Sequence, residues 1–215
     1  LGAFCDDALA VIAWAGAPVA WVGASLGGST GMHVLAADPT AIDRLVLVDI
    51  TPRPAMAGVD RIMQFMGANA VDGFASLDEA ADAIAAYQPH RPRPTDLSGL
   101  AKNLRLGEDG RWRWHWDPAF LSIRGTSVQG TEHGRERPPQ DLESLARTLH
   151  TPTLLVRGRL SDLVTEAEAA EFLALVPHAE YVDVAGAAHM IAGDRNDVFT
   201  DAVVSFLDRA GNAAH

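Results

Sequence analysis

The chain has 215 residues, of which 48% are apolar and 21% are charged, and its formal net charge is −11. Disorder is excluded as the main state, because the apolar surface is large enough to offset the entropy lost on ordering. No stretch approaches the about 18 apolar residues of a membrane-spanning helix. The acidic charge repels phosphate backbones and anionic lipid, so neither nucleic acid nor a membrane surface is an expected partner.

The single cysteine, Cys5, excludes an internal disulfide and a cysteine-based zinc site. With no recognisable targeting segment, we expect a cytoplasmic protein.

The first fifty residues alternate between helical and extended patterns. Residues 6–15 carry apolar side chains at helical spacing, and residues 19–22 are a short apolar run that predicts a strand buried on both faces. Residues 27–37 are small and predict a helix, and residues 44–48 form a second apolar strand. This order is typical of a parallel sheet.

The middle of the chain has shorter apolar runs and more prolines. Its predicted elements are helices over 59–68 and 77–87, a hairpin of 103–106 with 111–116, and a polar loop over 125–139. The parallel-sheet pattern then returns, with strands predicted over 153–156 and 180–184 and helices over 165–175 and 198–210. We therefore predict an α/β fold, a mostly parallel sheet flanked by helices. Residues 1–52 and 151–215 would form its core, and residues 53–150 a mainly helical cap insertion with its connector, too long for a plain loop.

The most informative motif is the pentapeptide Gly23-Ala-Ser25-Leu-Gly27, which lies between a predicted strand and a predicted helix. A tight strand-to-helix turn strains the serine backbone and pushes its hydroxyl into the open. Glycines on either side let the neighbouring backbones approach closely. The helix N-terminus behind the serine favours negative charge. The pattern predicts a nucleophilic serine.

A nucleophilic serine needs a base, and the base needs an acid to orient it. His189 follows the last predicted strand, and Asp162 follows the strand over 153–156. Both lie at strand C-terminal ends, where the active sites of open α/β sheets gather. Asp49, directly after the strand over 44–48, is the alternative acid. We favour Asp162, because its strand is the nearest in sequence to His189.

The chain resembles the α/β-hydrolase fold superfamily in four segments: VAWVGASLGGSTG at 19–31, RLVLVDITPR at 44–53, PTLLVRGRLSDLV at 152–164 and VAGAAHMIAGDRNDVF at 184–199. The order Ser, Asp, His is that of this superfamily. The resemblance implies Ser25 as nucleophile, Asp162 as acid, His189 as base and the Leu26 backbone N–H as oxyanion donor. It also implies a helical cap where the insertion lies. The serine argues against the aspartate-nucleophile branches and favours esterases, lactonases, carbon–carbon bond hydrolases and cofactor-free perhydrolases.

One departure from the family pattern concerns the segment before the serine. Family members carry roughly 80 residues there, including the strands and the loop that give the second oxyanion donor, whereas Ser25 follows 24 residues. The chain thus resembles a member without the N-terminal strands. We expect a complementing N-terminal segment, or pairing with a second copy, to cover the strand over 19–22. His133-Gly134 is a poor substitute for the missing loop, because nothing strand-like precedes it.

The sequence thus predicts a serine hydrolase that cleaves a small-molecule acyl substrate (an ester, lactone, thioester or carbon–carbon bond) through an acyl-enzyme and without a cofactor. The alternatives are a non-catalytic scaffold or fragment, and a perhydrolase. Candidate substrate-binding residues are Trp112, Trp114 and Met190. The alternative for the two tryptophans is the cap's own core, since alternate strand positions share one face. No histidine has metal-ligand spacing, so no metal site is expected.

Overall fold

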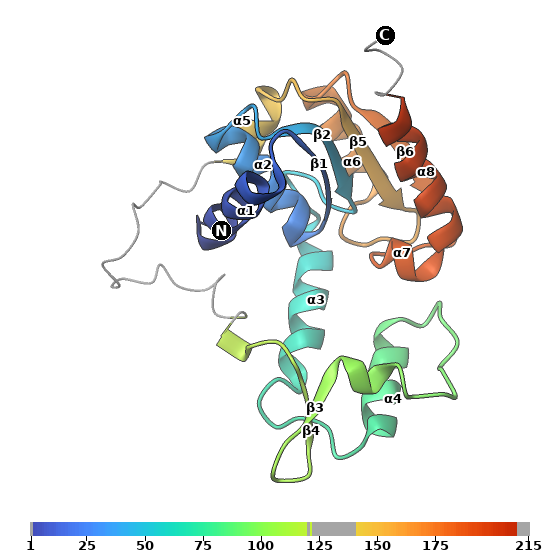
Figure 1. Cartoon of the computed structure of the whole chain (residues 1–215). Coiled ribbons are helices and arrows are strands. Elements are labelled where there is room, and N and C mark those ends of the chain that lie inside the picture. Colours follow the sequence, from blue (N-terminus) through green and yellow to red (C-terminus); the bar gives the residue numbers. More distant parts are fainter. Residues whose placement is uncertain (1, 120, 122–140, 210–215) are drawn as a thin grey trace. The chain divides into compact units, whose positions relative to one another are not determined.

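A computed structural model describes residues 2–119, 121 and 141–209 of the chain (Figure 1). It divides into two compact units, Leu1–Gly58 with Gly134–His215, and Val59–His133. We call them the sheet unit and the hairpin unit. The predicted insertion over 53–150 has wider bounds than the hairpin unit, because α5 (Leu142–Arg147) packs against helices of the sheet unit. The predicted loop over 125–139, with His133, lies outside the described residues.

The sheet unit is built on four parallel strands in the order β1-β2-β5-β6. They are β1 (Val19–Ala24), β2 (Ile42–Val48), β5 (Thr153–Gly158) and β6 (Glu180–Val184). The sequence prediction of a mostly parallel sheet is confirmed. Since all four strands run the same way, their C-terminal ends share one edge, and the predicted site residues follow those ends.

Helices flank this sheet, as predicted. The four long helices are α1 (Gly2–Ala15), α2 (Leu26–Ala37), α6 (Glu166–Leu175) and α8 (Asn196–Asp208). Two short helices, α5 and α7 (Ile191–Asp194), were not predicted, because four to six residues are too few to show a helical period. Among the described residues, no helix is both long and apolar enough to span a bilayer.

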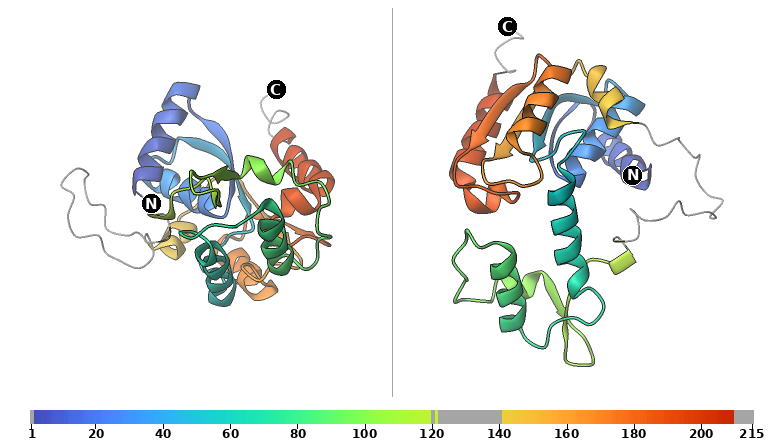
Figure 2. Two further views of the ribbon diagram at one scale, coloured as in Figure 1. Left: turned by 90° about the horizontal axis from the view of Figure 1, so that it is seen from below. Right: turned by 180° about the vertical axis from the view of Figure 1, so that it is seen from behind.

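The apolar run of β2 is explained by helices on both faces of the sheet (Figure 2). Leu45 and Leu47 point toward glycines of α2, which come close enough for a Cβ to touch these leucines. Val46 and Val48 point the other way and pack in a cluster with α8. Successive residues of a strand face opposite sides, so a strand covered on both sides is apolar throughout.

The first strand departs from the sequence prediction. β1 is the edge strand of the described sheet, in line with the expectation that it needs a covering segment, but it is not buried on both faces as predicted, since Val22 is 45% exposed. Its residues alternate between half-buried and exposed until Gly23. An apolar edge strand of this kind favours pairing with a further strand.

The hairpin unit confirms the predicted helices and hairpin. It contains α3 (Met56–Ala68, whose first turn lies in the sheet unit), α4 (Leu77–Tyr87), a 3-10 turn (Leu100–Lys102), β3 (Leu104–Leu106) and β4 (Trp112–Trp114). The two strands pair antiparallel, with Leu104 opposite Trp114. Phe74, Ala80 and Leu104 form a small buried core of their own.

Candidate active site

Ser25 lies at the turn between β1 and α2, where the motif predicted it. Its φ of +49° is in the region that residues with a side chain rarely occupy. The Ser25 N–H donates to the carbonyl of Val48 at 3.1 Å, which ties the turn to the end of β2. This strained strand-to-helix turn is the geometry of a nucleophile elbow.

Two glycines make the turn possible, and only one of them is in the pentapeptide. A Cβ on Gly23 would lie 2.4 Å from the carbonyl carbon of Gly27. A Cβ on Gly28 would lie 2.5 Å from Cγ2 of Ile50, whereas one on Gly27 would meet nothing within 4 Å. The expectation that Gly27 is needed for close approach is therefore wrong, and Gly28 has that role.

Asp49 follows β2 directly and also has a positive φ, of +48°. Its side chain is fully buried. The Gly158 N–H donates to Oδ1 at 3.1 Å, and the Ser161 hydroxyl donates to Oδ2 at 2.6 Å. An unusual backbone conformation and a buried carboxylate together mark a position that the surrounding structure has to hold in place.

His189 meets this carboxylate. Its Nδ1 lies 2.8 Å from Oδ2 of Asp49, and its side chain is 18% exposed. The sequence analysis favoured Asp162 as the partner of His189, with Asp49 as the alternative. The structure instead brings Asp49 to the imidazole. Asp162 is half-buried and directly follows Ser161, in the loop after β5.

The reason lies at the end of β5, the strand between β2 and β6. A Cβ on Gly158 would lie 2.3 Å from the carbonyl oxygen of Ala188, so the loop after β6 passes directly over this glycine. The loop is held there by the Leu160 N–H, which donates to the carbonyl of Ala187 at 2.8 Å. His189 therefore crosses β5 and reaches the end of β2. Nearness in sequence favoured the wrong strand for this contact.

Sequence reasoning missed three residues that hold the pair. They are Gly158, Ser161 and Asp194, whose carboxylate accepts a hydrogen bond from the Ala188 N–H at 2.9 Å. The available signal was position, since Gly158 ends the strand next to β2 and Ser161 follows it. Nothing in their residue types pointed to Asp49.

The predicted oxyanion donor, Leu26, is the first residue of α2. The first N–H groups of a helix have no acceptor within it, and they favour negative charge. The Leu26 N–H therefore lies in the first turn of the helix directly after Ser25, and its role as oxyanion donor stays a prediction.

The predicted substrate-binding residues are in different units. Met190 follows His189 in the sheet unit and is 53% exposed. Trp112 and Trp114 pack against the small core of the hairpin unit, and the Trp114 ring meets Phe74 edge-on at 5.5 Å. Trp114 also lines a hollow of about 500 Å³ in that unit. These contacts give both rings a structural role, and substrate binding by them stays a prediction.

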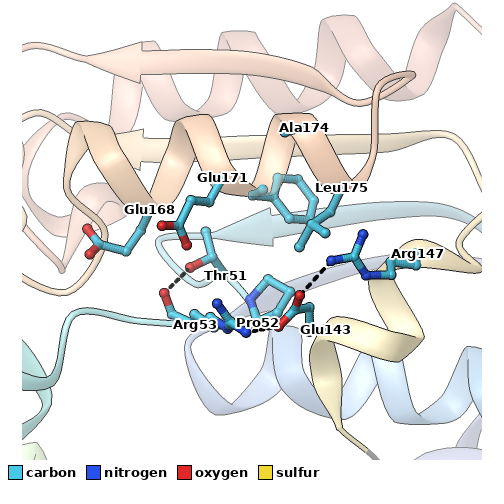
Figure 3. A pocket seen from close by; sticks show the side chains of 10 residues that line it. Thr51, Pro52, Arg53, Glu143, Arg147, Glu168, Glu171, Ala174 and Leu175 are labelled. Atoms are coloured by element: carbon cyan, nitrogen blue, oxygen red, sulfur yellow. Dashed lines mark hydrogen bonds and ion pairs between the residues drawn. The ribbon is translucent and has the colours of Figure 1, made fainter.

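A second hollow, of about 300 Å³, lies in the sheet unit (Figure 3). The side chain of Glu143 forms ion pairs there with Arg53 and Arg147. The lining consists of Thr51, Pro52, Arg53, Glu143, Arg147, Glu168, Glu171, Phe172, Ala174 and Leu175. It includes none of Ser25, Asp49 and His189, so this hollow is separate from the candidate site. Across residues 2–119, 121 and 141–209, no cluster of histidine, cysteine and carboxylate side chains could hold a metal ion.

The sequence matches a known protein family and several known hydrolases. A family model described as alpha/beta hydrolase fold matches residues 15–195. The chain is 27% identical over 178 residues to a 3-hydroxybutyrate-oligomer hydrolase of Cupriavidus necator, covering 80% of this chain and 59% of that protein. It is 27% identical to an esterase of Mycobacterium tuberculosis, covering 87% and 60%. An sn-1-specific diacylglycerol lipase of Mus musculus is also 27% identical, over 88% and 59%. The chain thus spans about three fifths of the length of these relatives.

Solved structures share the fold. The crystal structure of E-2-(acetamidomethylene)succinate hydrolase superposes with a TM-score of 0.78 at 23% identity, covering 95% of this chain and 72% of that one. The crystal structure of the Mycobacterium tuberculosis esterase gives a TM-score of 0.68 at 26% identity, covering 95% and 66%. The strained strand-to-helix turn at Ser25 agrees with the alpha/beta hydrolase fold that the family model describes.

Proposed function

The chain belongs to the alpha/beta hydrolase fold family, and on that premise we propose that it is a serine hydrolase that cleaves carboxylic esters. The observation that carries the proposal is the 2.8 Å contact between His189 Nδ1 and the buried carboxylate of Asp49, at the sheet edge that also holds the strained Ser25. Serine, histidine and a buried carboxylate are the parts of a catalytic triad.

The proposed reaction has two halves. Ser25 Oγ attacks the ester carbonyl carbon while Nε2 of His189 takes the hydroxyl proton, and Asp49 stabilises the imidazolium. The Leu26 N–H donates to the oxyanion of the tetrahedral intermediate. Its collapse breaks the bond to the alcohol oxygen, which leaves with the proton from His189. Water then attacks the acyl-enzyme by the same route and releases the acid and free Ser25.

The proposed substrate is an ester with an apolar group near the scissile bond. Two large apolar side chains beside the site are each 53% exposed, those of Leu160 and Met190. The Leu160 N–H is bonded to Ala187, so the two loops are joined next to His189. Relatives named as an esterase and a lipase support the ester class. Lactones, thioesters and carbon–carbon bonds would use the same attack on a carbonyl carbon.

Labelling of the full-length protein with a fluorophosphonate, followed by peptide mapping, tests this proposal. We expect one adduct, on Ser25, because only a serine activated by its base reacts quickly with such probes. Ser25→Ala should lose both the label and the hydrolysis of p-nitrophenyl esters, whereas Ser29→Ala on the same helix should keep both. A folded protein that is not labelled at Ser25 would overturn the proposal.

A further inference from the structure

The hydroxyl of Ser161 has all of its hydrogen-bonding capacity in use. A serine hydroxyl has one proton to donate and two lone pairs that accept. Its oxygen accepts from the N–H groups of Leu163 at 3.1 Å and Val164 at 3.2 Å. Its remaining partner is Oδ2 of Asp49, at 2.6 Å. Because the two amides can only donate, the hydroxyl proton is directed at Asp49.

This arrangement determines whether the Asp49 carboxylate accepts or donates a hydrogen bond in its contact with His189. Oδ1 of Asp49 accepts from the Gly158 N–H, and Oδ2 accepts from Ser161. Both oxygens therefore act as acceptors, which is the pattern of an ionised carboxylate. With the carboxylate ionised, the contact at 2.8 Å is a hydrogen bond that the Nδ1–H of His189 donates. Nε2 is left as the basic nitrogen.

We infer that Ser161 is a positioning residue, which holds the Asp49 carboxylate so that His189 keeps its proton on Nδ1 and presents Nε2 as the base. The expected effect of Ser161 on turnover rests on the proposed function. The hydrogen bonds that support the inference do not depend on that function. Ser161 is buried, 7% exposed, and does not itself touch the reacting atoms.

The loop that carries Ser161 is fixed from its other side as well. The guanidinium of Arg157, buried in β5, donates through Nε to the carbonyl of Val164 at 2.7 Å. Arg157 also pairs with Asp183 of β6 at 3.0 Å. Val164 is thus bonded through both its N–H and its carbonyl, which leaves the Ser161 hydroxyl little freedom to turn away from Asp49.

Steady-state kinetics of the full-length protein on p-nitrophenyl esters test the inference. For Ser161→Ala we expect kcat to fall about 10- to 100-fold with KM within about twofold, because a misaligned base weakens the transition state rather than binding. Ser161→Thr keeps the hydroxyl and should recover kcat to within about threefold of the wild type. Thr153→Val is the matched control, since it removes another buried hydroxyl, in β5 itself, which donates to the carbonyl of Thr151 at 2.8 Å.

Proton NMR gives a readout that does not need turnover. An imidazole Nδ1–H bonded to a carboxylate resonates far downfield, and loss of the signal in His189→Gln assigns it. We expect the signal in the wild type and in Ser161→Thr, and its loss or an upfield shift in Ser161→Ala. An unchanged signal with unchanged kcat in Ser161→Ala would overturn the inference. A wild type with the signal but without Ser25-dependent turnover would overturn the proposed function alone.

Discussion

The ends of β2 and β5 lie side by side, and each is followed by an aspartate, yet their surroundings differ. Asp49 is fully buried and accepts from Gly158 and Ser161 beside its contact with His189. Asp162 is half-buried, and the residue before it, Ser161, turns its hydroxyl toward Asp49. The end of β5 thus provides the donors, and the end of β2 provides the carboxylate.

This difference shows that a strand end can serve a site without carrying its charged group. Gly158 gives the loop after β6 room to pass, and its N–H also holds Asp49. The two strand ends therefore hold one carboxylate together. Removal of the Asp49 carboxylate should reduce turnover more than removal of the groups that support it.

Exchange of each aspartate for asparagine should give the largest difference in turnover between the two strand ends. In Asp49→Asn, the amide can turn its NH₂ toward Nδ1 of His189 and so force the proton onto Nε2. We expect kcat to fall about 10³- to 10⁴-fold, as for a triad whose histidine is held in the wrong tautomer. Asp162→Asn should stay within about threefold of the wild type. Ester turnover of the two variants decides between them, and a collapse in Asp162→Asn with normal Asp49→Asn would reverse the assignment.

Gly158→Ala tests whether the crossing over β5 delivers His189. The new Cβ would lie 2.3 Å from the Ala188 oxygen, which is backbone and must move. We expect kcat to fall about 100-fold, since a shift of about 1 Å in a catalytic group can cost that much. Gly67→Ala, where a Cβ meets nothing within 4 Å, is the matched control. Equal activity of both variants would show that the loop does not need its close approach.

Asp194→Asn tests the other support of the histidine loop. Its carboxylate accepts from the Ala188 N–H, next to His189, at 2.9 Å. An amide oxygen can still accept this bond but carries no charge, so we expect only about a 3- to 10-fold fall in kcat. Asp197→Asn, on a carboxylate that pairs with Arg195 at the surface, should leave kcat unchanged. A fall in both variants would point to a general charge effect.

Much of the sheet unit could be predicted from the sequence, because buried parallel strands are apolar throughout and glycines mark the elbow. Ser25 and His189 could be found for the same reason: each follows a recognisable strand. The pairing of His189 with Asp49 could not be predicted, because it depends on a loop that crosses β5 at Gly158. The local sequence of a strand does not show which strands lie beside it. The uncovered edge of β1 was expected, but the exposure of its faces was not, because an apolar run looks the same in an edge strand and a central one.

The smallest effect is expected at the far end of the loop after β5, where α6 begins. Thr165 and Glu168 form a capping box, in which the Glu168 carboxylate accepts from the Thr165 N–H at 2.9 Å. Burial raises the pKa of Glu168, but hydrogen bonds from Thr165 outweigh it and lower the pKa below the ordinary 4.5. The charged form is therefore favoured by folding, and its contribution is present above about pH 4.5 and is lost as the pH falls through the lowered value.

Glu168→Gln should accordingly reduce the free energy of unfolding by about 0.5 kcal/mol at neutral pH, and the difference from the wild type should shrink as the solution is acidified. Urea unfolding at pH 7 and near pH 3.5 measures it, with Glu166→Gln as an exposed control in the same turn. We expect kcat to stay unchanged, because Ser161 is held by Leu163 and Val164 rather than by the cap. A fall in kcat that follows the loss of stability would mean that the support of Asp49 extends along the whole loop into α6.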